Sequence, residues 1–240
     1  MLVSAAFFVA GIIKGMVGLG MPIVVLVFLA VPLGITNAIA LMLVPSVITN
    51  FWQAVFGPSL MPLLRRLWTF LLFSVLGICL GVSLLSYVTQ EVMLAFLGGL
   101  LALYSIFSLR NPQIRPPGRY EAVMSPAAGG LGGILFGMVG IFLVPGVIYL
   151  QALGLKKDEL VQALGITFIT LSITLFGAFV EKGVMNTELF LWSWAALVPA
   201  VLGLYLGQRL RSRVSETLFR TIFFWVLLFV GFHFIWSGWG

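Results

Sequence analysis

The chain has 240 residues, of which 61% are hydrophobic and only 8% are charged. A soluble domain of this length carries about 25% charged residues, so the composition excludes a water-soluble globular protein. Uncharged runs of about 20 residues recur along the chain, each long enough to cross the hydrocarbon layer as a helix. They lack the alternation of polar and apolar residues that is typical of membrane barrels. We therefore expect an all-α, polytopic membrane protein.

The charged residues and the single cysteine limit the possible partners and cofactors of the protein. Thirteen basic residues stand against seven acidic ones, and in a membrane protein such an excess is typical of cytoplasmic loops. We therefore expect a lipid bilayer and no nucleic acid. The single Cys79 excludes a cysteine-cluster metal site, and we expect no metal or cofactor. The sequence leaves both a monomer and a homodimer open.

The apolar runs predict two halves, residues 1–115 and 116–240, joined through a proline-rich stretch at 110–120. The predicted segments of the first half are 3–30, 36–56, 67–87 and 90–109. Those of the second half are 122–153, 160–180, 189–208 and 216–236.

Short motifs recur between these halves in the same order. Gly-Met-Val-Gly occurs at 15–18 and again at 137–140, each time shortly before a proline. A pair of glycines spaced by three residues occurs at 77–81 and again at 203–207. The similar offsets indicate an internal duplication.

The segments that open the halves, 3–30 and 122–153, are long and interrupted by glycine and proline near their centres. Glycine costs about 1 kcal/mol in a helix interior and proline about 3 kcal/mol, so one straight helix is disfavoured. Each segment is either a kinked spanning helix or a re-entrant hairpin of two half-helices. A hairpin is tolerated in a membrane where it is buried in protein or lines a cavity.

The positions of the basic residues decide between these alternatives. With eight full spans, the loop residues divide six against six. With two re-entrant hairpins, eleven basic residues fall on one side and only Lys182 on the other, as the positive-inside rule requires. We therefore predict an inverted 3+3 repeat in the inner (plasma) membrane, each half opening with a re-entrant, broken-helix hairpin and both termini outside.

Inverted repeats with broken helices are typical of secondary transporters, whose sites lie near the midplane between the repeats. Pro22 and Pro145 suit the first turn of each second half-helix. The helix N-termini there would favour an anion, and glycine would let it approach the backbone. The predicted substrate-binding residues of the two breaks are Gly18, Gly20, Pro22, Gly140 and Pro145.

Other candidate site residues are polar groups within apolar segments. Lys14 lies about twelve residues into its segment, near the midplane. It contacts the substrate, or it neutralises the C-terminal end of its own half-helix. The remaining candidates line a cavity or hydrogen-bond neighbouring helices: Ser46, Asn50 and Gln53 in the first half, and Gln162, Thr167 and Thr170 in the second.

The sequence disfavours an intramembrane enzyme, because His233 is the only histidine and no acidic residue lies clearly within the hydrocarbon. We expect no catalytic residues. An anion that leaves a cell with a negative interior gains about 2.3 kcal/mol per charge per 100 mV, so export requires no coupling ion. A passive anion channel of the same architecture is the alternative.

The segment Gly11-Ile-Ile-Lys-Gly-Met-Val-Gly-Leu-Gly-Met-Pro22, its copy at 133–145 and the duplicated layout resemble the TauE/SafE sulfite-exporter family, also called the toluene sulfonate uptake permeases. The resemblance covers essentially the whole chain. It implies an inner-membrane transporter of small sulfur-containing anions: sulfite, thiosulfate, a sulfonate or sulfoacetate. The second copy has Ile141 and Phe142 where the family often has glycines.

Overall fold

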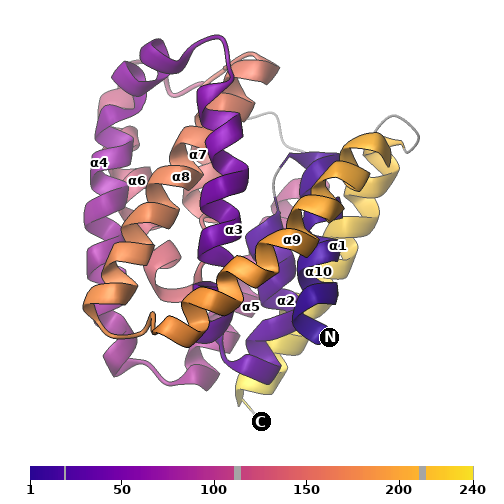
Figure 1. Ribbon diagram of the computed structural model, residues 1–240. Coiled ribbons are helices and arrows are strands. Elements are labelled where there is room, and N and C mark those ends of the chain that lie inside the picture. The colour runs from indigo at the N-terminus through magenta and orange to yellow at the C-terminus, as the bar shows by residue number, and fades with distance from the viewer. Residues whose placement is uncertain (19, 111–114, 211–214, 240) are drawn as a thin grey trace. The chain divides into compact units, whose positions relative to one another are not determined.

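A computed structural model describes residues 1–18, 20–110, 115–210 and 215–239. These residues form helices and no strands (Figure 1). Seven of the helical segments are long and apolar enough to cross a membrane. The all-helical, multi-pass membrane character predicted from the composition is therefore confirmed.

The helices of the predicted first half are α1 (Leu2–Val17), α2 (Met21–Leu33), α3 (Ile35–Val55), α4 (Leu60–Leu84), the 3-10 turn η1 (Leu85–Tyr87) and α5 (Gln90–Arg110). Those of the second half are the 3-10 turn η2 (Gly118–Tyr120), α6 (Glu121–Val139), the π-helical turn η3 (Leu143–Val147), α7 (Ile148–Ala152), α8 (Lys157–Glu181), α9 (Thr187–Leu210) and α10 (Glu216–Trp239).

Each of the six predicted spans coincides with a helix, although α4 begins seven residues before the predicted start at 67. Arg65 and Arg66 suggested a loop there, but both lie within α4. The seventh candidate span, Gly118–Val139, contains η2 and α6 and falls inside the segment predicted as the second hairpin. Its length alone fits either a span or one arm of a hairpin.

The chain divides into two compact units, which are described separately here. Unit 1 contains 1–45, 88–112 and 184–240, and unit 2 contains 46–87 and 113–183. Each unit takes segments from both predicted halves of the chain. Helix α3 passes from one unit into the other between Pro45 and Ser46.

In unit 1, α1 packs along α9, and α5 packs along α10 (Figure 1). The α1–α9 contact is close because glycines face backbone on both sides. A side chain added at Gly15 would overlap the carbonyl of Leu204, and one added at Gly203 would overlap that of Phe8. The two helices run parallel, since the contacting residue numbers increase together.

In unit 2, α4 packs along α6 in the same parallel manner (Figure 1). A side chain added at Gly77 would overlap the carbonyl of Gly130, and one added at Gly81 would overlap that of Ile134. Small residues bring helix backbones close together in membranes, where packing replaces the hydrophobic effect as the source of helix association. The glycine pairs at 77–81 and 203–207 therefore both serve close helix packing.

Pro45, inside α3, creates a defect that a side chain from α9 repairs within unit 1. Proline has no N–H, so the carbonyl four residues earlier, on Leu41, loses its helical hydrogen bond. The hydroxyl of Ser193 donates to that carbonyl over 2.8 Å and accepts from the N–H of Val44 over 3.2 Å. Ser193 is fully buried, so its hydroxyl replaces a backbone bond where water cannot.

We predict that Ser193→Ala destabilises the protein by about 1–3 kcal/mol, because a buried carbonyl then lacks a partner. Thermal unfolding in detergent measures the change. Ser74→Ala is the matched control: Ser74 is also fully buried, but its hydroxyl donates to Phe70 within its own helix, over 2.7 Å. Equal destabilisation by the two variants would contradict this account of the Pro45 defect.

Candidate functional site

The first predicted break lies in unit 1, between α1 and α2. Gly18 ends α1 with a φ of 87°, and its N–H donates to the carbonyl of Lys14 over 2.7 Å. Gly20 precedes α2 with a φ of 106°, in the left-handed region that favours glycine. Pro22 lies in the first turn of α2, where its missing N–H costs nothing. The predicted placement of Pro22 is confirmed; residue 19, between the glycines, lies outside the described residues.

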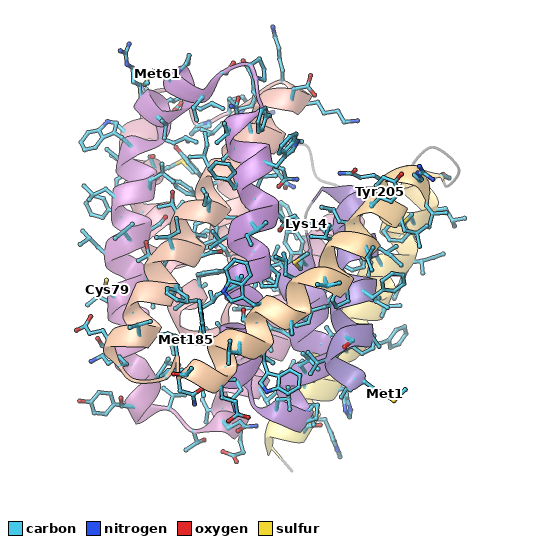
Figure 2. The ribbon with its side chains drawn as sticks, viewed as in Figure 1. Met1, Lys14, Met61, Cys79, Met185 and Tyr205 are labelled. Atoms are coloured by element: carbon cyan, nitrogen blue, oxygen red, sulfur yellow. The ribbon has the colours of Figure 1, made fainter. Side chains whose placement is uncertain are left out.

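Lys14 occupies the last turn of α1 and is only 4% exposed. By contrast, Cys79 and Tyr205 project outward from α4 and α9 (Figure 2). A cation near a helix C-terminus is favoured by the helix dipole. This position fits the reading of Lys14 as a charge that neutralises the half-helix end. It is also compatible with a substrate contact, which stays a prediction.

The second predicted break lies in unit 2, after α6. Gly140 ends α6 with a φ of 72°, and its N–H donates to Phe136 over 2.9 Å. Pro145 lies within η3, where Val144 has an extended backbone conformation (φ −116°, ψ 127°). Pro145 therefore precedes α7 by three residues, and an irregular turn joins α6 to α7.

Phe142 fills this second break. Its ring lies against Gly132 and Gly146, where no side chain could be added without overlap. The rings of Phe70, Phe136 and Phe168 surround it at centroid distances of 5.6, 6.3 and 6.3 Å. At the first break, by contrast, a side chain added at Gly18 would meet no atom within 4 Å. The two breaks therefore differ in chemistry.

Gln162, a predicted substrate residue, is engaged in a structural clamp. Its Nε2 donates to the carbonyl of Ala54 over 2.9 Å, and its Oε1 accepts from the N–H of Ser59 over 2.8 Å. The side chain thus ties α8 to the connection between α3 and α4. Thr170 is also partnered, because its hydroxyl donates to the carbonyl of Ile166 over 2.8 Å.

Ser46 and Thr167 differ from these residues. Ser46 is 3% exposed and Thr167 is fully buried. Neither hydroxyl has a hydrogen-bond partner within the part of the chain that the structure describes. A buried hydroxyl without a partner costs about 1–3 kcal/mol, so these two groups are unusual among the buried polar groups of unit 2.

Each of these two hydroxyls lies well inside its own helix. The end of α3 and the start of α8 are held together, because Ala54 binds Gln162 and Gln53 lies beside Gly165. Ser46 is nine residues before the end of α3, and Thr167 is ten residues after the start of α8. At 1.5 Å per residue both lie about 14–15 Å along their helices, about half the thickness of the hydrocarbon layer.

Asn50 and Gln53 complete the predicted set in unit 2. Asn50 is 4% exposed and lies one turn after Ser46 in α3, whereas Gln53 is half-buried. Sequence reasoning missed the third buried hydroxyl without a partner in the described chain, that of Tyr149 in α7. A tyrosine in an apolar run gives no signal that would have singled it out.

A cavity of about 310 Å³ in unit 1 was also missed. The residues that line it come from the start of α1, the end of α2, the start of α3 and the start of α9: Met1, Val3, Ser4, Leu33, Asn37, Leu41, Leu189, Trp192, Ala195 and Ala196. No predicted substrate residue lines this cavity.

An ion pair in unit 2 was missed as well. Arg66 of α4 binds both carboxylate oxygens of Glu121, over 2.7 and 2.8 Å, and donates to the carbonyl of Leu153 over 3.3 Å. One turn further along, Thr69 donates to Ser125 of α6 over 3.1 Å. Sequence analysis counted Arg66 only as a loop charge.

The sequence profile of the family described as sulfite exporter TauE/SafE matches residues 3–234. The chain belongs to this family. No curated protein and no solved structure matches the chain. Membership confirms the resemblance in the glycine-rich segments. It makes the protein a membrane transporter of sulfur-containing anions and not an enzyme, as the sequence predicted.

Proposed function

We propose that this TauE/SafE protein exports a small sulfur-containing anion (sulfite, thiosulfate, a sulfonate or sulfoacetate) across the inner membrane, through a midplane site between two inverted repeats. The observation that carries the proposal is the pair of buried hydroxyls, Ser46 and Thr167, without partners in the described chain. One comes from each predicted repeat, and both lie in unit 2.

The chemistry of this pair suits an oxyanion. Sulfite, thiosulfate and sulfonates present several acceptor oxygens, and neutral hydroxyl groups can donate to them. Because hydrogen bonds to a charged acceptor are stronger than neutral ones, two hydroxyls and the nearby amide of Asn50 would offset part of the cost of removing the anion from water.

The packing of the helices supports the inverted repeat. In unit 1 the first helix of the first half packs on a helix of the second half, α1 on α9. In unit 2 the first helix of the second half packs on a helix of the first half, α6 on α4. The glycines at these contacts correspond between the halves, with offsets of 122 residues for α1 and α6, and 126 residues for α4 and α9.

The ends of the two opening segments support the re-entrant hairpins. Arg66 contacts Glu121 at the start of α6 and Leu153 directly after α7, so residues 121–153 begin and end at the same guanidinium. Likewise, Met1 and Leu33, at the two ends of the first segment, line the same cavity in unit 1. A segment whose two ends meet returns to the side from which it entered.

We expect purified protein in liposomes to carry sulfite or a small sulfonate with a flux that saturates with substrate concentration. Thr167→Val and Ser46→Ala should each raise KM by roughly 2–10-fold, the value of one hydrogen bond. Without substrate, Thr167→Val should not lower the melting temperature, because it removes a hydroxyl that has no partner. Thr174→Val is the control and should leave KM unchanged, because the Thr174 hydroxyl lies outside the predicted set and donates to the carbonyl of Thr170 over 2.8 Å.

The form of the flux also separates the proposal from its alternative. Flux that rises linearly with concentration and shows no stimulation by substrate on the opposite side would indicate a passive channel. Saturable flux with unchanged KM in both hydroxyl variants would remove Ser46 and Thr167 from the site.

The charge of Lys14 provides a separate prediction. We expect Lys14→Met to lower the flux about tenfold or more and Lys14→Arg to keep most of it, because a buried cation in a membrane segment is costly and is retained for a purpose. Flux is measured per folded protein in liposomes. Loss of thermal stability with full flux would assign Lys14 to its helix end alone.

The topology can be tested with single cysteines in a Cys79→Ser background. Leu2→Cys and Val31→Cys flank the first hairpin, and Arg119→Cys and Lys157→Cys flank the second; all four positions are exposed. An impermeant thiol reagent added to intact cells should label the first pair and spare the second. Opposite labelling within either pair would show that the segment between them crosses the membrane.

A further inference from the structure

The start of α4 holds the second hairpin at both of its ends. Arg66 donates two hydrogen bonds to Glu121, which lies in the first turn of α6, and a third to Leu153, which directly follows α7. Arg66 and Glu121 are 39% and 29% exposed, so the pair is partly shielded from solvent. A planar guanidinium can bind a carboxylate with two parallel bonds and still donate elsewhere.

The charges at this point also match the helix ends. A carboxylate is favoured at the N-terminus of a helix, and a cation is favoured at the C-terminus. Glu121 meets the first condition for α6, and Arg66, bound to the carbonyl of Leu153, meets the second for α7. One ion pair therefore stabilises the start of α6 and the end of α7 together. The arginine of this pair lies on α4, which belongs to neither arm of the hairpin.

Contacts along α4 continue from this point to the break of the hairpin and to the proposed site. The ring of Phe70, one turn after Arg66, stacks on Tyr149 at 5.3 Å and meets the edge of Phe142 at 5.6 Å. Phe142 in turn meets Phe168, at 6.3 Å. Phe168 is adjacent to Thr167, so a shift of the hairpin would reach one of the two proposed substrate donors.

The corresponding place in unit 1 has no such clamp. At the offsets of the repeat, Trp192, Ala195 and Ala196 replace Arg66, Thr69 and Phe70, and Val3 replaces Ser125. All four unit 1 residues line the cavity of about 310 Å³ at the ends of the first hairpin. Where unit 2 has an ion pair and a hydroxyl pair, unit 1 has a cavity lined by apolar side chains at the four corresponding positions.

We propose that Arg66 is a positioning residue for transport, which fixes both ends of the second hairpin to α4 and thereby holds Phe142 and Thr167 in place. The clamp makes the second hairpin a fixed wall of the transporter, whereas Trp192 takes the place of Arg66 beside the first hairpin. This inference rests on the proposed transport site in unit 2, and the bond to Leu153 is its distinctive part.

The test compares Arg66→Met with the exchange variant Arg66→Glu/Glu121→Arg. The exchange can restore the ion pair between α4 and α6, but a glutamate at 66 cannot donate to the carbonyl of Leu153. We expect Arg66→Met to lower the melting temperature and to lower liposome flux about tenfold or more. The flux falls because the residues that line the proposed site are no longer held in position. The exchange should restore part of the melting temperature, because the ion pair returns although both charges then oppose the helix ends, and it should not restore the flux.

Arg65→Met is the matched control, because Arg65 precedes Arg66 in α4 and is exposed; its flux should equal that of the wild type. Wild-type flux in Arg66→Met, or full recovery of flux in the exchange variant, would overturn the proposal. A merely structural ion pair predicts that flux follows the melting temperature in all three variants.

Hydrogen exchange keeps this test independent of the proposed function. Amides of residues 148–153 should exchange about fivefold faster or more in Arg66→Met and in the exchange variant than in the wild type and Arg65→Met, because the end of α7 is released. If the wild type carries no sulfur anion, faster exchange still supports the clamp, and unchanged exchange overturns it. Failure of the transport proposal and failure of the clamp are thus distinguishable.

Discussion

In a hydrocarbon layer every polar group of the backbone must find its partner inside the protein, and this constraint accounts for the most specific contacts of the chain. Pro45 removes a backbone donor, and Ser193 supplies the missing bond. The connection between α3 and α4 leaves helix ends open, and Gln162 satisfies a carbonyl and an N–H there. Against this background, hydroxyls without a partner in the described residues, such as those of Ser46 and Thr167, are exceptions, and the proposed site rests on them.

The helices could be predicted from the sequence because hydrophobicity over about 20 residues reflects the thickness of the membrane. Which helices pack against each other could not be predicted. Gly77 and Gly81 indicate a helix surface without side chains, but glycine alone does not show which other helix packs on that surface. The start of α4 was misplaced for a related reason: Arg65 and Arg66 resemble loop charges, whereas Arg66 is satisfied by Glu121, 55 residues away in the chain.

The candidate site was predictable as a group of polar residues but not residue by residue. Gln162 and Thr167 look alike in sequence, as polar residues of one apolar helix. The structure separates them because both polar atoms of the Gln162 amide are bound, whereas the Thr167 hydroxyl has no partner among the described residues. That difference depends on neighbours from α3 and α4, which no local pattern encodes. Ser193 and Tyr149 went unnoticed for the same reason.

The two helix breaks differ in their surroundings, so under the proposed duplication the two opening segments need not act alike. Both breaks retain a glycine with positive φ at the end of the first arm, Gly18 and Gly140. A helix break exposes backbone N–H and carbonyl groups, and in a membrane each of these needs a partner. Two open breaks are therefore harder to tolerate than one. Phe142 covers the second break with an aromatic ring, and Arg66 closes the ends of that hairpin. The first break keeps glycine where the second has a ring. The backbone of the first break is thus more open than that of the second, where the ring of Phe142 is packed.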